Sequence, residues 1–271
     1  MMMRMSGRVL DAFLAAIVIF GSGTLSPVTA AEWGTLKARF VFDGPVPKRE
    51  KLLLNKDVEV CSKEHPLDED LIVNPESRGI QNVVVWLELK RGEALPAIHP
   101  SYAESESAKV RLTNHSCRFS PRIALLRTSQ TLVLGNDDPV AHSTVAFLTY
   151  NQPFNYGIAP GTVEGTKLQL DKVETRPAQI SCPIHSWMKA FLLVQDHPYM
   201  AVSDENGQIE IRDIPPGEWT FRVWQEKAGY VTSLTANGKK LDDKKGRYPL
   251  TIKGGTTSDI GDTPMTAADF E

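Results

Sequence analysis

Three metal-binding side chains lie within seven residues of this chain, and they restrict the folds that the chain can adopt. The stretch is Ser181-Cys182-Pro183-Ile184-His185-Ser186-Trp187-Met188, so a thiol, an imidazole and a thioether follow the spacing Cys-x2-His-x2-Met. Donors this close in sequence surround one small ion only from a loop. We therefore expect one strand to end at Cys182 and another to begin after Met188, with a further donor from a neighbouring strand end.

His142 is the favoured further donor. It lies 40 residues before Cys182, at the end of a polar turn that follows the apolar stretch 131–134. No sequence pattern fixes this separation, so three other histidines compete with it. His99 falls in an expected linker and His197 at the far end of the strand after the loop; the third is His115.

The four side chains together predict a copper site. Two imidazoles, a thiolate and a weak axial thioether are the ligand set of a blue-copper electron-transfer centre. This set accepts both Cu(I) and Cu(II), so we expect one copper ion held by His142, Cys182, His185 and Met188. Each residue alone is more typical of a protein core, and only their order and spacing favour the metal. Pro183 has no N–H and cannot donate to the sulfur.

Alternating apolar residues predict a chain that is β structure throughout, with little helix. Turn signals such as Pro160-Gly161 and Asn237-Gly238 separate the strands, and Asn206-Gly207 favours a hairpin between 201–203 and 208–211. We expect irregular structure at 47–79, a linker at 91–107 and a polar tail after residue 253. The expected strands are 34–42, 82–89, 109–113, 123–127, 131–134, 143–148, 166–170, 178–181, 191–195, 201–203, 208–211, 219–223 and 248–253.

The first thirty residues have the pattern of an export signal. Arg4 and Arg8 precede an apolar run at 12–20, and Val28-Thr29-Ala30 offers small residues for cleavage. An uncleaved membrane anchor is the alternative. Cleavage would move the net charge from −3 to −4, which argues against a nucleic-acid partner. We expect a periplasmic or extracellular product that is free of the membrane after cleavage.

Three cysteines leave an odd one over. If Cys182 binds the metal, Cys61 and Cys117 remain, and an oxidising compartment permits a disulfide between them. Two unpaired thiols are the alternative.

The ligand loop resembles that of the cupredoxins, in the short form of amicyanin-like members. The stretch from Cys117-Arg118-Phe119-Ser120-Pro121 through His142 to Phe154-Asn155 is similar to exported cupredoxin-like proteins of the methylamine utilisation type. The resemblance implies a Greek-key β-sandwich and the four copper ligands above, with Asn136, Ser143 and Pro183 next to them. Two residues depart from the family pattern: Ser143 replaces an Asn that ties the ligand loops together, and Arg122 stands where relatives often have His.

The flanking stretches resemble a different β module. Residues 199–224 are similar to part of a carboxypeptidase-regulatory or transthyretin-like module, and 34–47 and 82–89 are similar to its strands. We therefore expect a signal peptide (1–30), an N-terminal β segment (31–100), a cupredoxin domain (101–197), a C-terminal β segment (198–256) and a tail (257–271).

These features favour an electron carrier over an enzyme. A c-type cytochrome or a periplasmic oxidoreductase is the expected partner, with an exposed edge of His185 as the electron port. Trp187 is expected either in a docking patch or in the core. The alternatives are a copper-buffering or accessory protein that does not shuttle electrons, and an exported scaffold with an empty site. The chain has no Cys-x-x-Cys-His haem motif, P-loop or Gly-x-Ser-x-Gly, and Asp137-Asp138 and Asp242-Asp243 are expected in turns or solvent.

Overall fold

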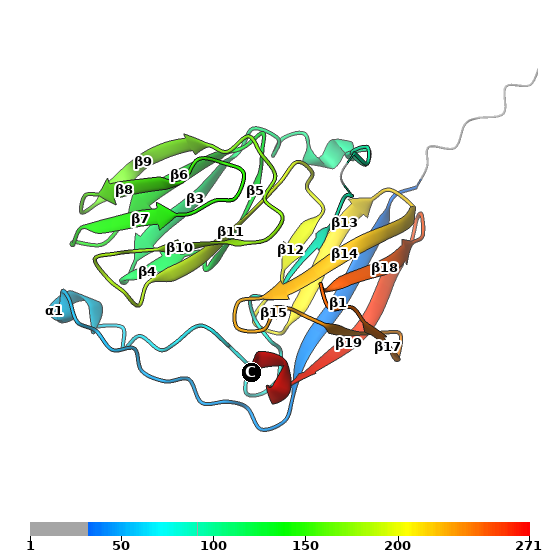
Figure 1. The fold of residues 1–271 in the computed structure, drawn as a ribbon, viewed down its shortest axis with the longest axis horizontal. Helices are drawn as coiled ribbons and strands as arrows, with labels where there is room; N and C mark the ends of the chain where they lie inside the picture. The colour runs from blue at the N-terminus through cyan, green and yellow to red at the C-terminus, as the bar shows by residue number, and fades with distance from the viewer. Residues whose placement is uncertain (1–31, 91) are drawn as a thin grey trace, which may run out of the picture. The chain divides into compact units, whose positions relative to one another are not determined.

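A computed structural model of the protein describes residues 32–90 and 92–271 (Figure 1). The predicted signal peptide lies outside these residues. Strands make up almost all of the regular secondary structure of the described chain, which confirms the all-β prediction. Among the described residues, none of the helices is long and apolar enough to cross a membrane. The strands form a sandwich lobe, made of β3 to β11, and a flank lobe, made of β1, β2 and β12 to β19.

The sandwich lobe has two sheets. One has the strand order β5-β11-β10-β7-β8 and the other β4-β3-β6-β9. Apolar side chains from both sheets form one core, as in the cupredoxin-like sandwich that we expected. The strands are β3 (Lys109–His115), β4 (Arg118–Ser120), β5 (Ile123–Arg127), β6 (Thr131–Asn136), β7 (His142–Ala146), β8 (Phe154–Ile158), β9 (Thr162–Gln169), β10 (Ala178–Ser181) and β11 (Lys189–Gln195).

The flank lobe combines strands from both ends of the chain. Its sheets have the orders β13-β1-β19 and β12-β2-β14-β15, with β18 on β14, and β16 pairs with β17. They share one core, so the N-terminal and C-terminal β segments pack together. The strands are β1 (Gly34–Asp43), β2 (Val84–Leu87), β12 (Met200–Val202), β13 (Gln208–Ile214), β14 (Gly217–Gln225), β15 (Gly229–Tyr230), β16 (Ser233–Ala236), β17 (Lys239–Asp242), β18 (Arg247–Ile252) and β19 (Thr257–Thr266).

Two expectations about the flank lobe are wrong. The expected polar tail contains β19, which pairs in parallel with β1 along most of its length. The turn at Asn206-Gly207 exists, with Gly207 N donating to Asp204 O at 3.0 Å, but the strands on its two sides enter different sheets. Only the second Asn-Gly pair, Asn237-Gly238, joins two paired strands, β16 and β17, and both of its residues have positive φ.

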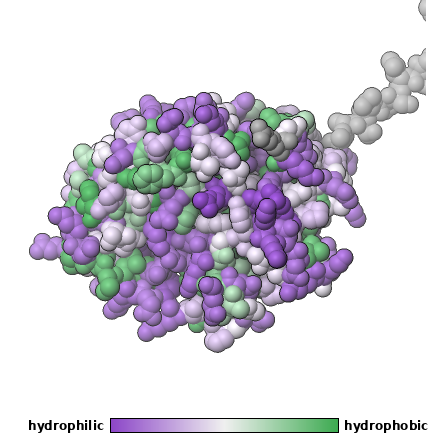
Figure 2. Space-filling view, viewed as in Figure 1, coloured by the Kyte–Doolittle hydropathy of each residue, from purple (hydrophilic) through white to green (hydrophobic). Residues whose placement is uncertain are grey.

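The segment between β1 and β2 runs along the sandwich lobe (Figure 1). We call residues 47–70 the cap. Its regular structure is the short helix α1 (Val58–Cys61), and two short 3-10 helices, η1 (Pro100–Tyr102) and η2 (Ala267–Phe270), lie elsewhere. On the face in Figure 2, hydrophobic residues gather in small separate patches among hydrophilic ones.

Candidate metal centre

The ligand loop is a tight turn between two paired strands. β10 ends at Ser181 and β11 begins at Lys189. Three backbone hydrogen bonds close the loop between them: His185 N donates to Cys182 O (3.2 Å), Met188 N to His185 O (2.9 Å) and Cys182 N to Met188 O (3.3 Å). These bonds bring the three predicted donors to one end of the sheet.

His142 joins this group from the neighbouring strand. It is the first residue of β7, which pairs with β10 and so begins beside Cys182. The Nδ1 atom of His142 lies 3.9 Å from the sulfur of Cys182, and that of His185 lies 3.7 Å from it. Each of the three residues offers a ligand atom within 4.8 Å of the others. Met188, which ends the loop, is fully buried in the same core.

These separations fit one shared ion. Bonds of about 2.0 Å to nitrogen and 2.3 Å to sulfur, arranged in a trigonal plane, put nitrogen and sulfur about 3.7 Å apart. The observed distances of 3.7 and 3.9 Å match this value. The chemistry of the donors, two imidazole nitrogens and one thiol, suits copper in both oxidation states.

A carboxylate binds the outer nitrogen of each imidazole. His142 Nε2 lies 2.8 Å from Asp138 Oδ2, and His185 Nε2 lies 3.0 Å from Asp57 Oδ2. In a neutral ring, such bonds place the proton on Nε2 and leave the Nδ1 lone pair free to bind a metal ion. Both rings are therefore oriented as metal ligands.

Sequence reasoning missed both carboxylates. Asp138 was expected in a turn or in solvent, but it is buried, and it also accepts a hydrogen bond from Cys117 N at 2.9 Å. Its position four residues before His142 was the available signal. Asp57 lies 128 residues from His185 in sequence, and no pattern in the sequence links the two.

The surroundings of Cys182 lower the pKa of its thiol. Burial alone would raise its pKa, but the hydrogen bond with His142 and the backbone N–H of Ser143 lower it below the usual value for a thiol. Burial would lower the pKa of His142, but Asp138 and Cys182 raise it overall. Burial lowers the pKa of His185, and Asp57 opposes this only in part. These shifts favour a thiolate at Cys182 beside a protonated His142. A metal ion would bind the thiolate once His142 gives up that proton.

Of the three residues expected next to the ligands, Ser143 contacts the Cys182 sulfur, Asn136 lies behind the turn before His142, and Pro183 faces solvent. Ser143 donates its backbone N–H to the sulfur of Cys182 at 3.3 Å, while its hydroxyl bonds Asn155 of β8 at 2.8 Å. Asn136 is buried and braces the turn before His142: its side chain donates to Val140 O at 2.8 Å and accepts from Asp138 N at 3.0 Å. Pro183 is exposed on the loop.

The two residues expected near the surface of the site, His185 and Trp187, are both buried. His185 has no exposed area, so its edge is not the expected electron port. Trp187 is also buried, and its indole N–H donates to Cys117 O at 3.1 Å. It therefore packs in the core and does not form a docking patch.

Cys61 and Cys117 are joined in a disulfide. The bond connects the end of α1 in the cap with the turn between β3 and β4. A second cluster of candidate ligands, Cys117, Asp138 and His142, shares this sulfur, which the disulfide already occupies. The three histidines that competed with His142 lie elsewhere; His197, for example, bonds Leu87 O at 2.9 Å.

Arg122, which departs from the family pattern, joins the two lobes. Its guanidinium lies 2.9 Å from Glu226, directly after β14, and 3.0 Å from Asp70 of the cap. The residue therefore has a structural role in this chain that the pattern did not suggest.

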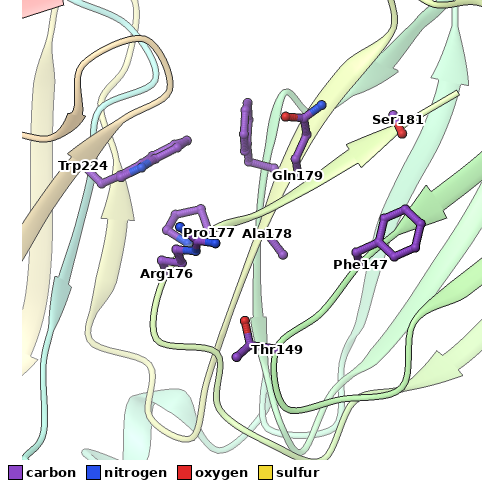
Figure 3. A pocket seen from close by; sticks show the side chains of 9 residues that line it. Phe147, Thr149, Arg176, Pro177, Ala178, Gln179, Ser181 and Trp224 are labelled. Atoms are coloured by element: carbon purple, nitrogen blue, oxygen red, sulfur yellow. The ribbon is translucent and has the colours of Figure 1, made fainter.

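An open groove lies along β10 (Figure 3). It has a volume of about 570 Å³ and is lined by residues that include Phe147, Arg176, Ser181 and Trp224. Ser181 directly precedes Cys182, so one residue of the backbone separates the groove from the ligand. Phe147 is the most exposed aromatic residue here, at 79%.

No protein-family model and no curated protein matches the chain. Among solved structures, it is similar to a copper-containing nitrite reductase from Thermus scotoductus (18% identity, 40% of this chain, 25% of that chain, TM-score 0.29). It is also similar to a purple cupredoxin from Nitrosopumilus maritimus (17%, 33% and 100%, TM-score 0.27) and to an amicyanin variant (10%, 41% and 98%, TM-score 0.27). The matched part spans a quarter of the nitrite reductase.

Proposed function

We propose that this chain is an exported cupredoxin that holds one copper ion and carries electrons rather than catalysing a reaction. The observation that best supports this proposal is that His142 Nδ1 and His185 Nδ1 lie 3.9 and 3.7 Å from the Cys182 sulfur. The residues that would hold the copper are His142, Cys182, His185 and Met188. When bound, copper would supply a one-electron couple between Cu(I) and Cu(II).

The protein's own residues would keep the ligands in one geometry in both states. The outer bonds of the imidazoles to Asp57 and Asp138 resist ring rotation, and the backbone bonds of the loop hold Cys182 and Met188. Because little has to move, each electron transfer would need little reorganisation. The Ser143 N–H on the sulfur withdraws electron density from it and so influences the potential.

The proposed partner is another redox protein, such as a c-type cytochrome or a periplasmic oxidoreductase. The edge of His185 is closed to it by burial. Both backbone neighbours of Cys182 reach the surface: Ser181 lines the groove in Figure 3, and Pro183 is exposed on the loop. An exported location agrees with the Cys61–Cys117 disulfide, which an oxidising compartment permits.

A second candidate function is copper storage or delivery without electron shuttling. The full burial of His185 favours it, because a site closed on that side retains its ion well and exchanges electrons slowly.

Metal analysis of the mature chain together with an optical spectrum and voltammetry tests these proposals. An electron carrier is expected to bind one copper, absorb intensely at about 600 nm when oxidised, and give a reversible potential. Copper binding without reversible cycling would favour storage. A chain that takes up no copper would leave only a scaffold role.

A further inference from the structure

The cap is fastened to the sandwich lobe around the ligand loop. Three of its apolar side chains, Leu52, Leu54 and Val60, pack against the core that contains Cys182 and Met188. Backbone hydrogen bonds join the two ends of the cap: Leu52 N donates to Pro66 O at 3.0 Å, and Asp68 N donates to Glu50 O at 2.8 Å. The cap is therefore an ordered cover over this end of the sandwich.

Two anchors fix the cap, one at the last residue of α1 and one farther along the chain. The disulfide joins Cys61 to Cys117, whose carbonyl accepts the indole N–H of Trp187 in the ligand loop. Farther along, Asp70 binds the amine of Lys189 at 2.6 and 2.8 Å. Lys189 directly follows Met188, so both anchors end at or beside the ligand loop.

Asp57 lies at the start of α1 and has an unusual backbone conformation. An Asp at this position commonly caps the helix with its side chain, but Asp57 makes no such bond. Its backbone is left-handed, with φ 45° and ψ 39°, a conformation that non-glycine residues seldom adopt. The carboxylate is directed instead at His185 Nε2, 3.0 Å away. Strain of this kind persists where the surrounding structure holds a residue for another purpose.

Asp57 contacts both the buried ring of His185 and solvent. The side chain of His185 is fully buried, whereas that of Asp57 is 31% exposed. Loss of the Asp57 contact would therefore both free the imidazole to rotate and open a path to the sulfur.

We infer that Asp57, held by the disulfide-anchored cap, is the positioning residue of His185 and closes the metal centre to exchange. This inference rests on the proposed copper site. The cap would slow the loss of the ion to competing ligands and keep small reagents from Cys182. Partners of outer imidazole nitrogens commonly change metal affinity by about 10–100-fold, and we expect an effect of this size on release.

The first experiment measures transfer of Cu(I) from the loaded full chain to an excess of a Cu(I) chelator. Asp57→Ala is expected to release copper about 10–100-fold faster than the wild type. Asp57→Asn, which keeps an acceptor oxygen but no charge, should fall between them. Glu59→Ala is the matched control, because it removes an exposed carboxylate from the same helix and should leave the rate unchanged. All variants should retain the thiolate absorption band.

The second experiment needs no metal. Alkylation of Cys182 by iodoacetamide is followed by mass spectrometry in the metal-free protein, where Cys61 and Cys117 are blocked by their disulfide. Asp57→Ala should be alkylated at least about tenfold faster than Glu59→Ala. The double variant Cys61→Ser/Cys117→Ser should also be alkylated faster, since it releases the anchor. Circular dichroism confirms that each variant is folded.

The two experiments separate the two proposals. Equal release and equal alkylation in Asp57→Ala and Glu59→Ala would overturn the role of the cap, even if the protein is blue. If the wild type binds no copper but Asp57→Ala still exposes Cys182, the copper proposal fails and the closing role of Asp57 stands.

Discussion

The indole N–H of Trp187 donates to the carbonyl oxygen of Cys117 at 3.1 Å, which ties the ligand loop to one half of the disulfide. We expect Trp187→Phe to lower the free energy of unfolding by about 1–2 kcal/mol, because a buried carbonyl loses its donor. Denaturant unfolding measures this loss. A docking residue would behave differently: the variant would keep its stability and exchange electrons more slowly with a partner.

Cys182→Ser is expected to abolish the absorption at about 600 nm and leave the fold intact. Serine is close to cysteine in size but supplies no thiolate, and the strands on either side of the loop remain paired. Absorption spectra and far-UV circular dichroism test this. A variant that kept the colour would refute Cys182 as the ligand.

Met188→Leu is expected to raise the reduction potential while the copper stays bound. Leucine removes one donor, and the more highly charged Cu(II) loses more from a missing donor than Cu(I) does. The weak axial ligand is one of the groups that set the potential. Voltammetry gives the potential and metal analysis the occupancy. Complete loss of copper from this variant would mean that Met188 is a main ligand and not an axial one.

The disulfide is expected to contribute about 4 kcal/mol to stability, since it closes a loop over 56 residues of sequence in the unfolded chain. The double variant Cys61→Ser/Cys117→Ser should lose about this amount in denaturant unfolding. Because both sulfurs are buried, the native protein should resist reductant, and only the unfolded protein should gain the mass of two hydrogens. A mass gain without denaturant would contradict this.

Protonation of Glu174 is expected to lower the stability of the protein in acid. Burial raises the pKa of its carboxyl, but hydrogen bonds from the backbone of Tyr150 (3.0 Å) and Asn151 (3.1 Å) and from other donors lower it overall. Its contribution is therefore complete above its ordinary pKa and is lost as pH falls through the lower folded value. Glu174→Gln should cost about 1–3 kcal/mol at pH 7.

Unfolding of Glu174→Gln and the wild type at several pH values measures this difference. It should shrink as the pH falls below about 4. A difference that stayed constant from neutral to acid pH would show that the charge of Glu174 has no part in it.

Local signals in the sequence were enough to predict most of the sandwich. Strands β5 and β10 have the expected bounds, since their apolar residues and turns are continuous in the sequence. The three donors of the ligand loop were found for the same reason: they share one short loop. Asp57 was missed because its bond to His185 exists only after the cap folds across the sandwich.

β19 was missed because its pattern is irregular. Its pairing with β1 shifts register between Lys37 and Arg39, where Gly261 adds a residue and breaks the alternation. Pro264 also argued against a strand. Because β19 is at the edge of its sheet, a proline there is tolerated. The local pattern alone could not show that β1 offered a free edge.

The pairing of β1 with β13 and β19 has a consequence for biogenesis. β1 precedes every strand of the sandwich lobe in sequence, and its two partners, β13 and β19, follow them all. The sandwich lobe lies wholly between β1 and these partners in sequence, so its strands can assemble while β1 is still unpaired. Until the final strand arrives, β1 keeps an open edge that can recruit strands from other molecules. Nascent or truncated chains are therefore the form of this protein that most needs a chaperone.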